Sequence, residues 1–163
     1  MQELMQIQQV VQDALQEAGL HAVAAYPETP MKRYEGAVAS VSVGAAEGKA
    51  LGFCNYLGEV YDEDKGTVRE RYGKQLQGQI QVEVRAERAA DCEAGCVLAS
   101  EVLLGRLPSG LQGGELNWQG IEWEQATGMF LRRGSLSCLA LFMAETQEEE
   151  ATFLDFRLKG VLK

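Results

Sequence analysis

Apolar and polar residues alternate at a period of two in several parts of the chain, which predicts strands. Residues 79–88 show the clearest alternation, with apolar side chains at Ile80, Val82, Val84 and Ala86. This period is expected of a strand that has one buried and one solvated face. Similar patterns predict further strands at 37–45, 129–143 and 153–162. The last of these reaches almost to Lys163, so we expect the C-terminus to be built into a sheet.

Two other segments space their apolar residues by three and four, which predicts helices. The first covers residues 2–18, ends at Gly19, and has an apolar stripe of Leu4, Ile7, Val11, Leu15 and Ala18. We expect the second to begin at Asp91, whose carboxylate can cap the first turn, and to run to about Arg106. Its predicted buried stripe consists of Cys92, Cys96, Ala99, Leu103 and Leu107. Gly95 is unfavourable inside a helix, so it indicates close packing.

Residues 44–77 carry apolar groups without a clear period, among them Phe53, Tyr56 and Tyr61. We expect an extended hairpin or a long arm in this region. Its tip would be the turn at 64–66, because Gly66 can adopt a positive φ angle.

Residues 116–123 predict a second, tight hairpin. If Gln119 and Gly120 form its loop, Trp118 faces Ile121 across the strands and both tryptophans lie on one side. Such a cluster is usually structural. An aromatic platform that binds a ligand is the alternative for Trp118 and Trp123.

The predicted order of elements is a helix, strands, a long arm, a strand, a second helix and then further strands. Runs of strands beside a few helices favour the α+β class. We expect one domain over residues 1–163, because this length supports one continuous core. The simplest arrangement is a single mixed or antiparallel sheet with both helices on one face.

Composition narrows the possible functions. The chain has 163 residues and a formal net charge of −9, which disfavours binding to nucleic-acid phosphates as its main task. Its apolar runs are shorter than the ~20 residues that a membrane span needs, and its N-terminal part lacks the basic start and apolar centre of a secretion signal. We therefore expect synthesis in the cytoplasm, with no membrane and no sequence-specific nucleic acid as partner.

Motifs for chemistry are missing from the sequence. The four cysteines and His21 are not spaced as a metal site or a disulfide framework, so we interpret the thiols as reduced core residues: Cys54, Cys92, Cys96 and Cys138. There is no phosphate-binding loop, dinucleotide fingerprint or serine-elbow pattern. We expect no catalytic residue, no cofactor and no enzyme activity. An active site formed by residues that are distant in the sequence but close in the fold stays open as an alternative.

Two features favour assembly with other subunits. The arm carries apolar groups that a monomer would have to cover, and the basic pair Arg132 and Arg133 follows Met129 and Phe130. Acidic segments occur at 62–64 and 145–150. Opposed charges of this kind could orient head-to-tail contacts in a ring. The candidate interface is therefore Phe53, Tyr56, Tyr61, Met129, Phe130, Arg132 and Arg133.

The order of elements also resembles a known family. An N-terminal amphipathic helix ends in the residues ALQEAG at 14–19, a central strand leads into a capped helix, and the chain closes with TGMFLRR at 127–133 and FLDFRLKG at 153–160. Together these segments resemble the small tail-terminator, or tail-completion, proteins of long-tailed phages and prophages. The resemblance covers most of the chain, and the region around 44–77 departs most from the family pattern.

This resemblance implies a structural protein of the virion without catalytic residues. Such proteins form a homo-oligomeric ring, commonly of six subunits, that caps the tail tube and meets the head connector. The expected partners are further copies of the chain, the tail-tube protein and the head-connector protein. The expected location is the host cytoplasm during assembly and then the virion tail. The alternative is a small intracellular ligand-binding domain that uses Trp118 and Trp123.

Overall fold

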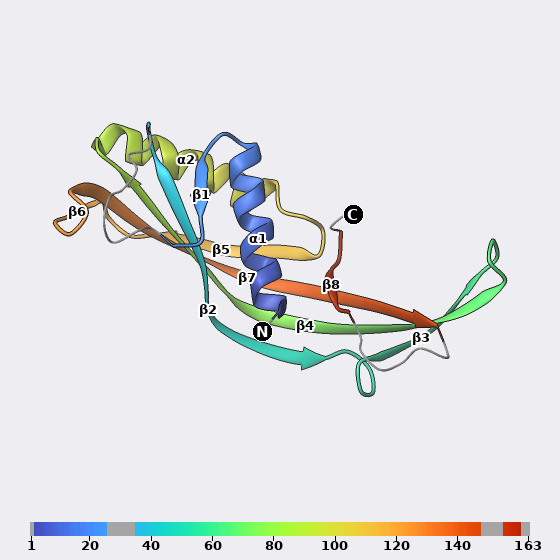
Figure 1. The fold of residues 1–163 in the computed structure, drawn as a ribbon. Coiled ribbons are helices and arrows are strands. Elements are labelled where there is room, and N and C mark those ends of the chain that lie inside the picture. Colours follow the sequence, from blue (N-terminus) through green and yellow to red (C-terminus); the bar gives the residue numbers. More distant parts are fainter. Residues whose placement is uncertain (1, 26–34, 148–154, 161–163) are drawn as a thin grey trace.

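The computed structural model describes residues 2–25, 35–147 and 155–160 (Figure 1). Two helices and eight strands follow one another along the chain as α1 (Gln2–Glu17), β1 (His21–Val23), β2 (Val38–Ala50), β3 (Tyr56–Asp62), β4 (Thr67–Ala86), α2 (Ala89–Gly105), β5 (Leu111–Trp118), β6 (Glu122–Glu124), β7 (Met129–Gln147) and β8 (Arg157–Leu158). Within the described residues, these strands belong to one sheet, in which β1 and β2 are parallel and the other pairs are antiparallel. The expected α+β class with a single mixed sheet is confirmed.

Two long strands form the centre of the sheet. β4 and β7 pair antiparallel without a register shift, from Arg69 opposite Gln147 to Ala86 opposite Phe130. Shorter strands then lie end to end along their outer edges. β2 and β3 share the free edge of β4, while β6, β5 and β8 share the free edge of β7. The predicted strands at 79–88 and 129–143 are therefore parts of longer ones.

Both helices cover the same face of the sheet, as expected (Figure 1). α1 contacts β1, β2 and β8, and α2 contacts β4, β5 and β7. The alternate residues of β4 and β7 that face these helices are almost fully buried and form the main core with the helix stripes: Ile7, Val11, Leu15, Ile80, Val82, Val84, Leu103, Leu136 and Phe142. The period-two and period-three-to-four patterns thus identified the buried positions.

The start of α2 differs from the prediction. The helix begins at Ala89, and the N-cap position is Arg88, which makes no side-chain capping bond. Asp91 lies within the first turn, where a carboxylate still suits the positive end of the helix dipole. Gly95 is buried as expected for a site of close packing, because an added Cβ would lie 2.7 Å from the Ala37 Cβ and 2.9 Å from the Val84 Cγ1.

The hairpin predicted for residues 116–123 is wrong. β5 and β6 do not pair with each other. Instead both pair with β7, with Trp118 opposite Gly134 and Trp123 opposite Phe130. The Gln119 N–H donates to the Arg133 carbonyl over 2.8 Å, so the chain continues along β7 where the prediction had it turn back. The tight hairpin here joins β6 to β7 through a turn at 125–128.

The C-terminal strand is much shorter than predicted. Of the expected strand at 153–162, the structure describes 155–160, and only Arg157 and Leu158 pair with β7. Lys159 and Gly160 form a turn, and Gly160 has a φ angle of +87°. The remaining predicted positions, including Leu154, lie outside the described residues.

Candidate interaction surfaces

The arm is the part of the sheet that extends beyond both helices. It consists of the β3–β4 hairpin with the adjoining ends of β2 and β7 (Figure 1). Its tip is the turn at 63–66, in which Gly66 has a φ angle of +61°. The Asp62 carboxylate accepts hydrogen bonds from the backbone N–H groups of Asp64 and Lys65 and so stabilises this turn.

Phe53 lies on a two-residue turn between β2 and β3. Cys54 and Asn55 both adopt positive φ angles, 51° and 67°, and the Tyr56 N–H donates to the Phe53 carbonyl over 2.9 Å. Positive φ at both central positions is typical of a tight type I′ turn. The turn leaves 86% of Phe53 exposed, whereas Tyr56 packs edge-on against Tyr72 with ring centroids 5.6 Å apart.

Apolar side chains lie on both faces of the arm. Tyr61 is 62% exposed and faces Val68 on the neighbouring strand. On the other face, Leu51, Leu57 and Met143 converge on Gly73, where an added Cβ would lie 2.7 Å from a Leu57 methyl carbon. The arm therefore has a small apolar cluster of its own and further apolar surface that faces solvent.

The arginines of the arm are paired with carboxylates, whereas Glu63 and Asp64 at the tip are exposed. Arg69 pairs with Asp62 at 3.0 Å and with Glu145 at 3.6 Å, and Arg71 pairs with Glu145 at 3.1 Å. The Tyr72 hydroxyl donates to Glu70, and this hydrogen bond raises the pKa of the tyrosine. The exposed features of the arm are therefore its aromatic groups and the acidic residues of its tip.

The other predicted interface residues lie at the opposite end of β7. Met129 is buried, Phe130 is half-buried, and the Arg132 guanidinium donates to the Gln119 carbonyl over 2.7 Å. Arg132 and Arg133 point to opposite faces because they are neighbours in a strand. Arg133 pairs with Glu83 and Glu122, so its charge is matched within the chain.

These two groups of residues are far apart. β7 runs from Met129 to Gln147, and at about 3.3 Å per residue it spans roughly 60 Å. Phe53, Tyr56 and Tyr61 flank one end of this ladder, and Met129 to Arg133 flank the other. The structure therefore does not bring the two halves of the predicted interface together within one chain.

The two tryptophans have different environments. The Trp118 ring lies against Gly134, and its indole N–H donates to the Ser100 hydroxyl on α2 over 2.8 Å. Trp123 is 56% exposed and packs edge-on against Phe130 at 5.0 Å. Their β7 partners are four residues apart, which corresponds to about 13 Å along the strand. The geometry gives a half-buried structural tryptophan and a separate exposed one in place of a shared platform.

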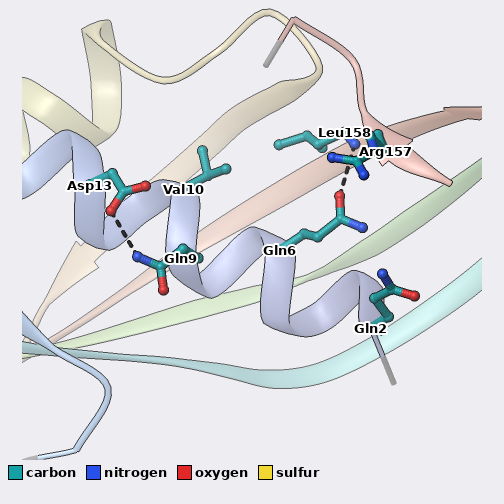
Figure 2. A pocket seen from close by; sticks show the side chains of 7 residues that line it. All are labelled: Gln2, Gln6, Gln9, Val10, Asp13, Arg157 and Leu158. Carbon is teal, nitrogen blue, oxygen red and sulfur yellow. Dashed lines mark hydrogen bonds between the residues drawn. The ribbon is translucent and has the colours of Figure 1, made fainter. Parts of the chain in front are cut away.

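A shallow cavity of about 230 Å³ lies between α1 and β8 (Figure 2). Its polar side chains are mostly bonded to neighbours in the chain. The Gln6 amide group donates to the Phe156 carbonyl and accepts from the Leu158 N–H, while Gln9 donates to Asp13. Arg157 pairs with Asp155 at 2.9 Å. The cavity therefore belongs to the contact that holds β8 against α1.

Three of the four cysteines are buried and unsuited to reaction as thiolates. Burial raises the pKa of the Cys96 thiol to about 12, and it also raises the pKa values of Cys92 and Cys138. Cys54 is exposed on the arm. Within the described ranges, no group of three or more His, Cys, Asp or Glu side chains is placed to hold a metal ion.

One apolar surface was missed by the sequence interpretation. Val97 is 62% exposed and Leu104 is 61% exposed on the outer side of α2. The signal was present in the sequence, because α2 carries apolar residues on all sides. The period-based prediction recorded only the stripe that faces the sheet.

Comparisons with known proteins place the chain in no family. No protein-family model matches it, and no curated protein matches its sequence. It is similar to a chain in the solved structure "Virion of native gene transfer agent (GTA) particle", with 19% identity and a TM-score of 0.35. The match covers 84% of this chain and 94% of that chain. A likeness at this level supports no functional conclusion. In the described residues, no helix has the length and apolar character to cross a membrane.

Proposed function

We propose that the chain is a phage-type structural protein that assembles with further copies of itself through its arm. The observation that carries this proposal is the almost complete exposure of Phe53 on a tight turn beyond the helices. An ordered turn that holds a phenylalanine in solvent has a cost, because burial of such a side chain is worth about 1.5–3 kcal/mol. A contact that buries Phe53 and Tyr61 would recover this free energy.

The shape of the chain favours contacts between unlike ends. The arm lies at one end of the β4–β7 ladder, and the exposed Trp123 lies beside Phe130 near the other end. A contact of arm to far end is heterologous, and repeated contacts of this type close into a ring or grow into a filament. A ring is the form expected for a tail terminator, and we propose this form.

Apolar surface, and not opposed charge, would orient the subunits in this ring. The earlier hypothesis relied on Arg132 and Arg133 facing an acidic segment of a neighbour. Because Arg133 already pairs with Glu83 and Glu122 in the same chain, its charge would attract an acidic segment of a neighbouring subunit only weakly. In its place, the aromatic groups of the arm would contact the Trp123–Phe130 pair of the neighbouring subunit.

The ring would cap the tail tube and join it to the head connector, so its proposed partners are the proteins of those two structures. We infer a structural and not a catalytic role. The net charge of −9 suits a ring through which DNA passes, because negative walls repel phosphate groups. Its proposed locations are the host cytoplasm during assembly and then the virion tail.

The test compares the mass of the purified protein with that of an arm variant. The double substitution Phe53→Ser and Tyr61→Ser removes two exposed aromatic groups without opening the core, so circular dichroism should stay unchanged. Light scattering should show a multimer for the wild-type chain and a smaller species for the variant, and electron microscopy should show rings only for the former. Met5→Ser is the matched control, because Met5 is 68% exposed on α1, away from the arm.

A wild-type chain that stays monomeric from micromolar to near-millimolar concentration would count against the ring. A multimer whose mass is the same in the arm variant would keep the assembly but reject the arm as its contact. Wild-type rings that persist in the Met5→Ser control and disappear in the arm variant would support the full proposal.

A further inference from the structure

α2 is apolar on the side that faces away from the sheet as well as on the side that packs against it. Its inner stripe is buried, with Cys92, Cys96, Ala99 and Leu103 below 5% exposure. Its outer residues are exposed, and the apolar ones are Ala89, Ala90, Ala94, Val97 and Leu104. A helix on the surface of a globular protein normally carries polar residues on its outer side. The outer side of α2 is therefore an unpartnered face.

The spacing on this face suits another helix. Exposed residues lie at positions 90, 94, 97, 101 and 104, which are steps of four, three, four and three. Four of these residues are apolar and the fifth is Glu101. A row with this spacing is the one along which two helices pack side chains into each other's gaps at a crossing angle near 20°, here with one carboxylate inside the row. The small side chains of Ala90 and Ala94 allow the backbone of a partner helix to approach closely.

The charges on α2 determine the kind of helix that fits. Glu93 and Glu101 are its exposed charged residues, and Asp91 is half-buried; the helix contains no Lys or Arg. A second copy of α2 would thus add only carboxylates to the row itself, since the exposed Arg88 and Arg106 lie just beyond the two ends of the helix. The exposed charges near the arm tip, including Glu63 and Asp64, are also mostly acidic. Another copy of this chain is a poor occupant for electrostatic reasons.

We propose that the outer face of α2 binds an amphipathic helix of a different protein, with apolar residues at heptad spacing and Lys or Arg beside them. Val97 and Leu104 supply the apolar contacts, and Glu93 and Glu101 pair with the basic residues of the partner. Helix-in-groove recognition uses anchors at this spacing. This face is separate from the arm half of the proposed ring contact, because α2 lies over β4, β5 and β7. Its first turn begins three residues after Ala86, which pairs with Phe130 at the far end of the ladder, so Val97 and Leu104 and not the first turn carry the test.

The test uses two designed peptides as probes. Each is a three-heptad helix with Leu at the seam positions and a fluorescent label; one carries Lys at the flanking positions and the other carries Glu. Fluorescence anisotropy against the full chain should give a Kd at least about tenfold lower for the Lys peptide, which corresponds to one well-placed contact. Val97→Ser with Leu104→Ser should raise this Kd by about tenfold or more.

Further variants separate the contribution of the glutamate charges to binding from the location of the binding surface. Glu93→Gln with Glu101→Gln should weaken binding of the Lys peptide and reduce its dependence on salt, because exposed ion pairs are screened. Met5→Ser, and the arm variant Phe53→Ser with Tyr61→Ser, should bind the Lys peptide as the wild-type chain does. Retained binding in the arm variant distinguishes this surface from the proposed ring contact.

Several results would overturn the proposal. Equal binding of the Lys and Glu peptides would reject the basic partner, and unchanged binding by the Val97 and Leu104 variant would reject the face. A lower multimer mass in that same variant would identify a second copy of the chain as the occupant. If the wild-type chain binds neutral phosphatidylcholine vesicles and the Val97 and Leu104 variant does not, the occupant of this face is a lipid surface instead.

Discussion

Gln6 connects the first helix to the last described strand, and its removal should weaken the whole fold. Its side-chain amide donates to the Phe156 carbonyl over 2.7 Å and accepts from the Leu158 N–H over 3.1 Å, as Figure 2 shows in part. The amide group thus takes the place of a neighbouring strand for the free edge of β8. Gln6→Ala removes both bonds and leaves two backbone groups to find other partners.

The expected loss follows from these two bonds. Each partly buried hydrogen bond contributes about 0.5–1.5 kcal/mol, and an unpartnered buried group adds to the loss. The free energy of unfolding should therefore fall by about 1–3 kcal/mol in Gln6→Ala. For a chain of this size, each kcal/mol corresponds to a Tm change of about 2–4 °C, so a mid-range loss lowers the Tm by about 4–8 °C.

Gln9→Ala is the matched control. Gln9 lies on the same helix, and its amide bonds only to Asp13 at the exposed surface. Both substitutions replace Gln by Ala in a helix, so the gain in helix propensity cancels in the comparison. Urea unfolding followed by circular dichroism gives the two free energies, and hydrogen exchange at the Leu158 amide shows whether β8 opens first. A difference below about 0.5 kcal/mol between the two variants would refute the proposed role of Gln6.

Three further predictions follow from buried and charged groups. The hydrogen bond from Arg85 lowers the pKa of Glu124 in the folded protein. The ion pair therefore stabilises the fold fully above pH 4.5, and this stabilisation is lost as the pH falls through the folded-state pKa. In acid titrations followed by Tm, the Glu124→Gln variant should show a smaller loss of Tm than the wild-type chain. Gly95→Ala should destabilise by about 1–3 kcal/mol through overpacking, whereas Gly105→Ala, with open space around it, should be neutral or gain up to about 1 kcal/mol in thermal unfolding. A thiol reagent should label Cys54 at once and Cys96 only on unfolding; equal labelling rates in the native protein would contradict the burial of Cys96.

Local pattern was sufficient to predict the elements and their buried faces. The alternation in 79–88 and the three-to-four spacing in 2–18 depend only on which side of a strand or helix is buried, and this information is local. The close packing at Gly95 was also predictable, because glycine destabilises the interior of a helix and is expected there only where a larger side chain would not fit. The pairing of each strand with its neighbours could not be predicted in this way, because it depends on residues far away in the sequence. Whether residues 116–123 turn back on themselves or continue along a neighbour depends on β7, which follows them in the chain.

The charge partners of the candidate interface residues could not be predicted, for a related reason. A charge on a strand has partners that the sequence does not place beside it. Arg133 pairs with Glu83, fifty residues away in the chain, and with Glu122, so a basic pair that looked available in the sequence is neutralised by the sheet. The exposure of Phe53 and Tyr61 was easier to predict, because they had no place in a periodic pattern, whereas the exposed Val97 and Leu104 were missed.

The β4–β7 ladder explains how one small chain could serve two kinds of partner. It is continuous over eighteen paired positions, and continuous antiparallel pairing keeps the arm in a fixed direction relative to the helices. The arm offers exposed aromatic groups beside paired arginines, whereas α2 offers aliphatic groups beside carboxylates. Surfaces with such different chemistry favour different partners, and the distance along the ladder keeps a partner on Val97 and Leu104 away from the arm of the same chain. A ring subunit that must hold its neighbours and also receive a second protein needs this separation.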